Sequence, residues 1–491
     1  MPSRTEEANL ASPLDGQYGS EQPLMEAQAS NANRPVQGED SLSVAIVGGG
    51  IVGIILALGL IDRGVRVAVY ERASDFNEIG AGIAFTGVTR ECMTKLSSSV
   101  IASLKRVANE NQLAYDNYWD GYHNDVTNSD DETPERTLLF QLPNAKMAWW
   151  SCLRSHFLDN LARALPSDIV RFGKELMSYE DSDSDTPAPV TLRFADGTTE
   201  TCDVLVGCDG IRSRVRQQLF ANTHPQACQP RYTHKTCYRA VIPMAAAESA
   251  LGESKAHNHC MHTGPGAHVL SYPIARHTLL NVVIFLSDSD SDSDFKSADQ
   301  DNPHIRARSR DDILARLASW RPEVRTLITQ IPETPLVWRI DDTAEHPAPW
   351  YALGRVCLAG DAAHASSPHH GAGAGFGVED ALALATALGL VMEETPIPTR
   401  AGKRQEAIAA ALAAYNDVRY ARTQWLVRSS RETGDIYEWM YAGSGSDPAK
   451  MRAEIAARQK VIWDFDVAEM VEQTRWRYRA RIGGEGGGPA Y

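Results

Sequence analysis

The chain has 491 residues, of which 43% are hydrophobic and 23% are charged, as in an ordinary globular protein. This length exceeds what one hydrophobic core usually supports, so we expect two domains with appendages. The formal net charge of −15 argues against nucleic acid and anionic membrane surfaces as partners.

Eight cysteines are spread along the chain, and no two of them form a CxxC pair. In a chain of this length they indicate reduced, mostly buried thiols in a cytoplasmic protein, not a disulfide framework or a zinc site. Residues 1–40 are polar and lack the basic start and apolar run of a signal peptide. We expect this segment to be a disordered N-terminal extension.

The first regular structure is predicted to be a βαβ unit. Ser43–Val47 fits a buried parallel strand, Ile51–Arg63 a helix capped by Gly64, and Val65–Tyr70 a second strand. The uncharged run Val44–Ile61 is long enough to raise the question of a membrane span. Its glycines cluster as a phosphate-binding turn requires, so a buried strand and helix explain the run better.

The remaining elements follow from apolar patterns. Helical spacing predicts a helix near Ala148–Leu165, and the run Ser287–Asp294 predicts an exposed acidic loop without the geometry of a calcium site. Strands are expected at Leu138–Leu142, Val190–Phe194, Val204–Gly207, Tyr238–Pro243, His268–Pro273, Leu279–Phe285 and Arg355–Leu358. Helices are expected at Val378–Leu390, Arg404–Arg431 and Lys450–Arg479.

These elements predict an α/β fold with a Rossmann-like dinucleotide-binding domain, a sheet-rich second domain and C-terminal helices. The first domain comprises residues 41–225 and 340–400, and the second comprises residues 226–339. The helices occupy residues 401–480, and a flexible tail occupies residues 481–491.

The turn of the βαβ unit carries a phosphate-binding pattern, because Gly48, Gly50 and Gly53 satisfy GxGxxG. Gly48 permits the tight turn, Gly50 lets the backbone approach a pyrophosphate, and Gly53 lets helix and strand pack closely. The helix N-terminus offers free N–H groups to the phosphates, and Glu71 can accept hydrogen bonds from a ribose. The pattern predicts a dinucleotide site and does not separate FAD from NAD.

Two later motifs favour a flavin. Asp209 and Asp361 each stand just past the end of a predicted strand, where an aspartate can bind the ribityl hydroxyls. The glycine-rich run after Pro368 lets backbone N–H groups reach the isoalloxazine edge, and the next helix directs its positive end at the ring. The expected contact residues of that run are Gly371, Ala372, Gly373 and Ala374.

In this order and spacing the three motifs resemble the single-component FAD-dependent aromatic hydroxylases with the para-hydroxybenzoate and salicylate hydroxylase fold. The resemblance covers about Ser43 to Arg479. It implies that the first domain binds FAD, with Gly82 and Arg154 among the flavin contacts, and that the second domain binds substrate. It also implies NADPH or NADH as a transient electron donor, O2 as co-substrate, and oxygen transfer from a flavin C4a-hydroperoxide.

Within that family the chain is most similar to fungal polyketide-pathway hydroxylases that dearomatise phenols. The shared segments are Asp120–His123, Tyr232–Lys235, Tyr238–Ala240, Gly264–His268, Tyr272-Pro273 and Pro368–Gly371. In that subgroup an arginine and a tyrosine hold the phenolate, and they match Arg239 and Tyr272. Arg239 would lower the pKa of the phenol, and Tyr272 would orient the phenolate or a neighbouring carbonyl. Cys237 and Tyr238 stand where the subgroup is more apolar.

The expected partner is a small phenolic substrate, and the chain is expected to be a monomer or homodimer. No metal is expected, because no carboxylate or cysteine completes a coordination set with His364, His369 and His370. His262 and His268 either line the substrate pocket or pack in the sheet. Three other functions stay open: a salicylate-type decarboxylating hydroxylase, a flavin oxidase or dehydrogenase, and a non-enzymatic flavin-binding regulator.

Overall fold

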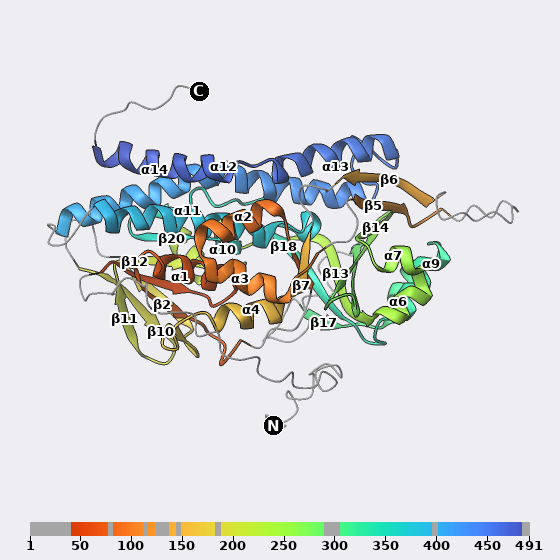
Figure 1. The fold of residues 1–491 in the computed structure, drawn as a ribbon, viewed down its shortest axis with the longest axis horizontal. Coiled ribbons are helices and arrows are strands. Elements are labelled where there is room, and N and C mark those ends of the chain that lie inside the picture. Colours follow the sequence, from red (N-terminus) through yellow and green to blue (C-terminus); the bar gives the residue numbers. More distant parts are fainter. Residues whose placement is uncertain are drawn as a thin grey trace, which may run out of the picture. The chain divides into compact units, whose positions relative to one another are not determined.

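The computed structural model describes residues 41–76, 82–110, 115–123, 137–143, 149–181, 188–288, 305–394 and 401–483 (Figure 1). The predicted extension at residues 1–40 and most of the acidic loop and of the tail lie outside these ranges. Residues 481–483 still belong to the last helix.

A six-stranded, mostly parallel sheet contains the three strands that precede the predicted motifs, namely β1 (Ser43–Val47), β12 (Val204–Gly207) and β20 (Val356–Leu358). Its order is β19 (Ala352–Leu353), β20, β12, β1, β2 (Arg66–Tyr70) and β8 (Val170–Arg171). Runs of Val and Ile form these strands because both faces of a parallel sheet are covered. The βαβ prediction is confirmed, with α1 ending at Ile61 and Gly64 at a φ of +75°.

A second, eight-stranded sheet is almost wholly antiparallel. Its order is β17 (Ile305–Ala307), β18 (Leu336–Asp342), β13 (Arg231–Pro243), β16 (Leu279–Ser287), β15 (Ala267–Ile274), β14 (Cys260–Gly264), β5 (Tyr115–Asp120) and β6 (Leu138–Pro143). Only the β14–β5 pair within it is parallel. The segment of β5 and β6 was assigned to the first domain, and the division of the chain into domains stays a prediction.

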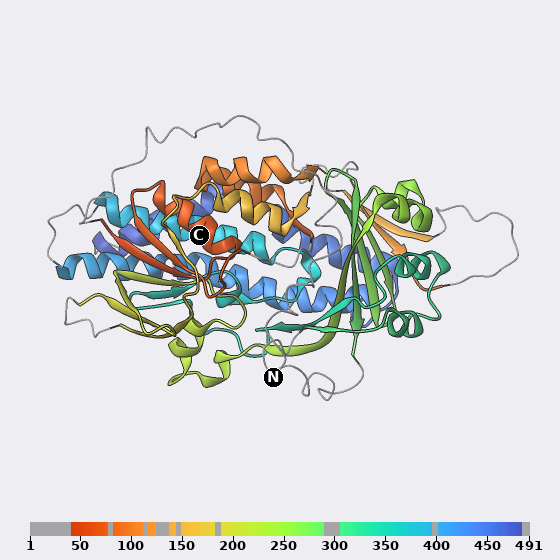
Figure 2. The same ribbon diagram turned by 90° about the horizontal axis from the view of Figure 1, so that it is seen from below.

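Four short helices pack on one face of the eight-stranded sheet, beside its green strands in Figure 2. They are α6 (Met244–Leu251), α7 (Glu253–Ala256), α8 (Arg310–Arg316) and α9 (Pro322–Thr329). Together they bury Trp320 and cover the apolar side chains of that face. The opposite face is therefore the one left for a ligand.

Two three-stranded sheets complete the strands. One is β11 (Thr199–Cys202), β10 (Val190–Phe194) and β9 (Leu176–Glu180), and the other is β3 (Gly82–Phe85), β7 (Trp150–Leu153) and β4 (Asn109–Glu110). The helix expected near Ala148–Leu165 was too long, because α4 spans only Arg154–Ala162. Cys152 instead pairs with Ile83 in β7, where long-range strand pairing overrides the local helical spacing.

The remaining helices are α2 (Gly87–Leu96), α3 (Ser98–Val107), α5 (Arg214–Phe220), α10 (Asp361–His364), α11 (Gly373–Glu394), α12 (Ala401–Tyr437), α13 (Pro448–Trp463) and α14 (Val467–Gly483). Among the helices described, α11 alone is long and apolar enough for a membrane span, and 94% of its most apolar window is buried within the protein. It lies between α1 and α12.

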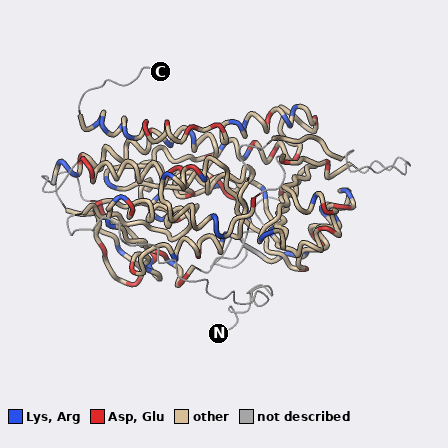
Figure 3. Tube along the Cα trace, viewed as in Figure 1, with Lys and Arg blue, Asp and Glu red and all other residues tan. Residues whose placement is uncertain are grey.

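The distribution of charged residues and the burial of the cysteines follow the expectations from composition. Basic and acidic residues are interspersed along the described elements (Figure 3). All eight cysteines are free thiols, and six of them are buried, as predicted.

Candidate functional site

The first turn of the parallel sheet has room for glycine alone at two positions. A Cβ atom on Gly48, whose φ is +105°, would lie 2.3 Å from the Cys208 carbonyl oxygen. A Cβ atom on Gly53 would lie 2.1 Å from the Gly48 carbonyl oxygen. Gly50 differs, because no atom lies within 4 Å of its Cβ position and no side chain caps the helix that it starts. The turn thus leaves open space in front of free helical N–H groups, which suits a pyrophosphate.

Glu71 fixes this turn from the end of β2. Its Oε2 accepts a hydrogen bond of 2.7 Å from the Gly49 N–H, and its Oε1 accepts one of 2.9 Å from the Ala73 N–H. Each carboxylate oxygen has a further lone pair. Glu71 can therefore hold the turn and still accept a hydrogen bond from a ribose.

Asp209 presents an unsatisfied oxygen after β12. Its Oδ2 accepts hydrogen bonds from the Arg214 and Val215 N–H groups, at 2.6 and 3.2 Å. Its Oδ1 is buried and has no hydrogen-bond partner within the described ranges. Burial raises the pKa of Asp209, even though these hydrogen bonds oppose the shift. A ligand hydroxyl would satisfy the buried oxygen, so the site fits a polyol such as the ribityl chain.

Asp361 lies at the start of α10, with an exposed side chain and directly after Gly360 at a φ of +61°. Burial lowers the pKa of the nearby Arg216 to about 10, against the attraction of Asp209 and Asp361. Both predicted ribityl-binding aspartates are therefore near enough to this buried guanidinium to attract its charge.

A buried charge network holds the Gly360 turn in place. Asp380 on α11 accepts hydrogen bonds from the Gly360 N–H at 3.0 Å, from His364 Nε2 at 2.5 Å and from Arg419 Nε at 2.8 Å. Burial opposes ionisation of Asp380, but His364 and Arg419 lower its pKa to about 2. His364 thus positions the loop that carries Asp361.

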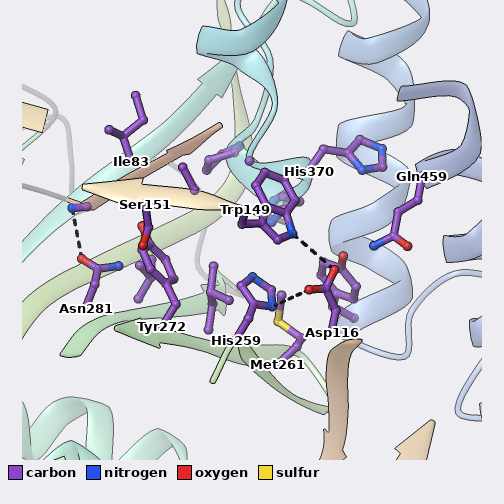
Figure 4. Close-up of a pocket in the computed structure, with 18 of the residues that line it drawn as sticks. Ile83, Asp116, Trp149, Ser151, His259, Met261, Tyr272, Asn281, His370 and Gln459 are labelled. Carbon is purple, nitrogen blue, oxygen red and sulfur yellow. Dashed lines mark hydrogen bonds and ion pairs between the residues drawn. The ribbon is translucent and has the colours of Figure 1, made fainter. Parts of the chain in front are cut away.

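One cavity lies against the eight-stranded sheet, with about 1200 Å³ of empty space including its open mouth. β3 and the turn Pro368–Gly371 form one wall, the sheet forms the other, and α13 closes the end (Figure 4). The cavity brings together four predicted site residues, namely Gly82, Arg239, Tyr272 and Gly371.

Strand register explains which side chains face this cavity. Alternate residues of a strand share a face, so Asn281, Val283 and Phe285 of β16 all line it. Across the sheet, Arg239 pairs with Val283, Val283 with Leu270, Leu270 with Met261, and Met261 with Tyr118. This row places Arg239 near one edge of the cavity floor and β5 at the other.

Arg239 is a half-buried cation in an apolar wall. Its guanidinium carbon lies 5.6 Å from the centre of the Trp338 ring. No carboxylate of the described ranges forms an ion pair with it, and its buried Nε has no hydrogen-bond partner there. A half-buried cation without an ion-pair partner favours an anionic ligand.

Tyr272 lies where the eight-stranded sheet meets strand β3. A Cβ atom on Gly82 would lie 2.7 Å from the Tyr272 hydroxyl, and the Gly82 N–H donates to Asn281 Oδ1 at 3.2 Å. Burial raises the pKa of Tyr272, although Arg239 opposes the shift. Tyr272 therefore stays a neutral hydrogen-bond donor at physiological pH.

Other predicted contacts lie outside this cavity. Arg154 is the first residue of α4 and half-buried, and its neighbour Leu153 pairs with Gly82. Ala372 lies next to Gly371, and Gly373 and Ala374 begin α11, as expected for a backbone that meets a flavin edge. Their roles stay predictions.

Some of the histidines considered from the sequence line the cavity and others do not. His262 and His268 do not line the cavity; both are fully buried in the sheet, where His268 stacks on Phe285. His369 and His370 do line it, and His370 Nε2 lies 2.9 Å from Ser429 Oγ. Within the described ranges no cluster of three His, Cys, Asp or Glu side chains could hold a metal ion.

Sequence reasoning missed several lining residues from distant segments, namely Asp116, Trp149, His259, Asn281, Gln459 and Trp463. The alternation of Asp116 and Tyr118 in β5 was the available signal for one of them. Cys237 and Tyr238, which left the pocket shape in question, do not line the cavity.

Comparisons with known proteins show the family of the chain. A family described as "FAD binding domain" matches residues 41–428. FAD-dependent monooxygenase SAT7 from Stachybotrys chartarum is 60% identical over 90% of this chain and 93% of that protein. Salicylate hydroxylase asL1 from Sarocladium schorii is 42% identical over 91% of this chain and 93% of that protein.

Among solved structures, a salicylate hydroxylase in complex with its substrate superposes with a TM-score of 0.74 and 30% identity, covering 89% of this chain and 98% of that one. The chain therefore belongs to the FAD-binding-domain family and is an FAD-dependent monooxygenase of the salicylate hydroxylase type.

Proposed function

We propose that this monooxygenase hydroxylates a phenolic polyketide of the resorcinol aldehyde or ketone type and that the product is dearomatised. The observation that carries the proposal is Arg239, a cavity-lining cation without an ion-pair partner in the described ranges. Bound FAD, reduced by NADPH or NADH, would supply the activated oxygen from O2.

Arg239 would ionise the phenol. A cation within a few ångströms lowers the pKa of a phenol by about 1–3 units, and the phenolate would in turn neutralise the half-buried guanidinium. A phenolate is the more electron-rich ring and therefore the better nucleophile. Tyr272, which burial keeps neutral, would donate a hydrogen bond to the phenolate or to a neighbouring carbonyl.

The apolar sheet face would keep water from the reacting oxygen. Met261, Leu270, Val283 and Phe285 line the cavity between Arg239 and β5. Exclusion of water protects a reactive flavin from unproductive decay. Where the attacked carbon carries a methyl group, no proton can leave that carbon, and the ring remains a dienone.

The FAD itself would be held by the residues of the three turns. Gly48, Gly50 and Gly53 would admit the pyrophosphate, and Glu71 would bind the adenosine ribose. Asp209 and Asp361 would bind the ribityl chain. Gly82, Arg154 and the run Gly371–Ala374 would contact the isoalloxazine ring.

A salicylate-type decarboxylating hydroxylase is the second candidate. Two similar proteins are named salicylate hydroxylases, and Arg239 could equally hold the carboxylate of salicylate. Only the pocket would distinguish the two activities.

Product analysis tests the proposal. The FAD-loaded enzyme is incubated separately with a methylated resorcinol aldehyde and with salicylate, each with NADPH or NADH, and products are identified by mass spectrometry. We expect the aldehyde to gain one oxygen atom without loss of carbon. Formation of catechol and CO2 from salicylate, with the aldehyde unchanged, would replace the proposal by the second candidate.

A further inference from the structure

We infer that the substrate is an elongated phenol whose side chain ends in a hydrogen-bond donor, and that Asp116 binds this donor at the end of the cavity opposite Arg239. The inference rests on the proposed function in one respect, namely that Arg239 receives the phenolate.

The two charged residues lie near opposite edges of the same cavity floor. Arg239 is on β13 and Asp116 is on β5, and both line the cavity. Between β13 and β5 the strand order runs through β16, β15 and β14, which makes four inter-strand steps. At about 4.8 Å for each step, the two backbones are roughly 19 Å apart. Even after the reach of both side chains, the gap exceeds one aromatic ring.

Asp116 is a buried carboxylate, 1% exposed, on the cavity wall. Its Oδ2 accepts a hydrogen bond of 3.4 Å from Trp149 Nε1. Its Oδ1 lies 3.7 Å from His259 Nδ1, which is too far for a hydrogen bond. Figure 4 shows the Asp116 and His259 side chains turned toward each other at the right-hand end of the cavity.

The facing nitrogen of His259 supplies an independent sign of a ligand. His259 Nδ1 is buried and has no hydrogen-bond partner in the described ranges. Buried polar atoms are normally satisfied by the protein, by water or by a ligand. A hydroxyl between these two groups would donate to Asp116 and accept from His259, or donate to Asp116 alone if the imidazole is protonated on its other nitrogen.

The part of the cavity between Arg239 and Asp116 suits an unsaturated or alkyl chain. The His259 ring is stacked on Tyr272 at 6.1 Å and on Trp149 at 6.2 Å, measured between ring centres. Met261 lines the cavity on the strand that follows His259. Flat and apolar surfaces of this kind bind side chains without directional bonds.

Two probes test the inference. Both are methylated resorcinol aldehydes with the same alkyl side chain, but one chain ends in a hydroxyl and the other in a methyl group of similar size. Dissociation constants are measured with oxidised, FAD-loaded enzyme from the change in the flavin absorbance spectrum. A hydrogen bond to a buried carboxylate should make the wild-type enzyme bind the hydroxyl probe roughly tenfold or more tightly.

Two variants then assign the preference to Asp116. Asp116→Leu should abolish it, and Asp116→Asn, which keeps an acceptor oxygen but removes the charge, should reduce it severalfold. If the leucine variant does not retain FAD, the asparagine variant decides. Glu175→Gln removes an exposed carboxylate from the surface and should keep the wild-type ratio. A purely structural Asp116 would weaken both probes equally and leave their ratio unchanged.

Failure of the inference and failure of the proposed function give different results. Equal wild-type affinities, no binding of either probe, or an unchanged ratio in both Asp116 variants would overturn the inference. A second outcome separates the two. If the wild-type enzyme binds the hydroxyl probe more tightly and the Asp116 variants lose that preference, the role of Asp116 is supported. If neither probe then gives an oxygenated product, the proposed phenol hydroxylation is refuted.

Discussion

Replacing Arg239 by methionine should disable ionisation of the bound phenol while leaving the flavin site intact. The substitution keeps most of the aliphatic stem and removes the charge. Arg239 forms no ion pair within the described ranges, so the substitution leaves no buried carboxylate without its partner. The fold and the FAD content of the variant should therefore match those of the wild-type enzyme.

The size of the effect follows from the electrostatics of the cavity. Two unit charges 4 Å apart interact by about 4 kcal/mol at an effective dielectric constant of about 20. Burial of the phenolate offsets part of this energy, so we expect a net lowering of the phenol pKa by about 1–3 units. Loss of the cation would reduce the ionised fraction at neutral pH roughly 10- to 1000-fold, and kcat/KM should fall by the same factor.

The sign of the pH dependence distinguishes this role from simple loss of binding. A phenol is ionised above its pKa, and the variant raises that pKa, so the activity of Arg239→Met should recover as the pH rises toward 9. The assay is kcat/KM for a methylated resorcinol aldehyde between pH 6 and pH 9, with the absorbance of bound phenolate as a second readout. Arg193→Met, which breaks an exposed ion pair with Glu180, serves as the control. An Arg239→Met profile parallel to that of the wild-type enzyme would refute the reasoning.

Three further predictions concern the flavin turns and the buried charges. Gly50→Ala should leave the melting temperature of the apoprotein unchanged but weaken FAD binding. Gly48→Ala, whose Cβ would lie 2.3 Å from a carbonyl oxygen, should lower both the melting temperature and the affinity for FAD. Scanning calorimetry and FAD fluorescence measure the two effects, and equal behaviour of the two variants would contradict the account of the turn. Glu438 is fully buried beside Lys235 and His268, so Glu438→Gln should cost roughly 3–5 kcal/mol in urea denaturation, and Asp435→Asn, at the 36% exposed partner of the same lysine, should cost less than about 1 kcal/mol. Because the pKa of Asp380 falls from 3.8 to about 2 in the fold, its network contributes about 2 kcal/mol of stability that is fully present above pH 3.8 and is lost as the pH falls toward 2. The difference in unfolding free energy between wild type and Asp380→Asn should therefore shrink over that interval. A constant difference would argue against this contribution of Asp380.

The flavin side of the fold could be predicted because its signals are local. The glycine spacing of the first turn and the Val- and Ile-rich strand before it lie within a short stretch, and the observed βαβ unit matches them. A Cβ atom on Gly48 or Gly53 would lie 2.3 or 2.1 Å from a backbone carbonyl oxygen, so only glycine fits at these two positions. Because only glycine fits at these positions, the turn can be read from the glycine spacing in the sequence.

The segment before α4 could not be predicted in the same way. The apolar residues from Cys152 onward recur with helical spacing, but Cys152 pairs with Ile83 in a strand. The pairing partner lies far away along the chain, and no property of the segment itself reveals it. Tertiary strand pairing therefore decided the conformation.

The substrate side combines both situations. Arg239 and Tyr272 were expected from a resemblance, and the structure places both on the cavity because their strands flank β16 in the sheet. Asp116, His259 and Gln459 meet at the far end only through the order of β5 and β14 and the packing of α13. Neither that order nor that packing is encoded in a motif.

The most direct test of the account is oxygen incorporation from isotopically labelled dioxygen. The FAD-loaded enzyme, a methylated resorcinol aldehyde and NADPH are combined under the labelled gas, and a parallel anaerobic sample contains the phenol without nicotinamide. We predict phenol-dependent NADPH oxidation, one labelled oxygen atom in the product, and an oxidised flavin in the anaerobic sample. Reduction of the flavin by the phenol alone, with no label in the product, would contradict the account and identify an oxidase or dehydrogenase instead.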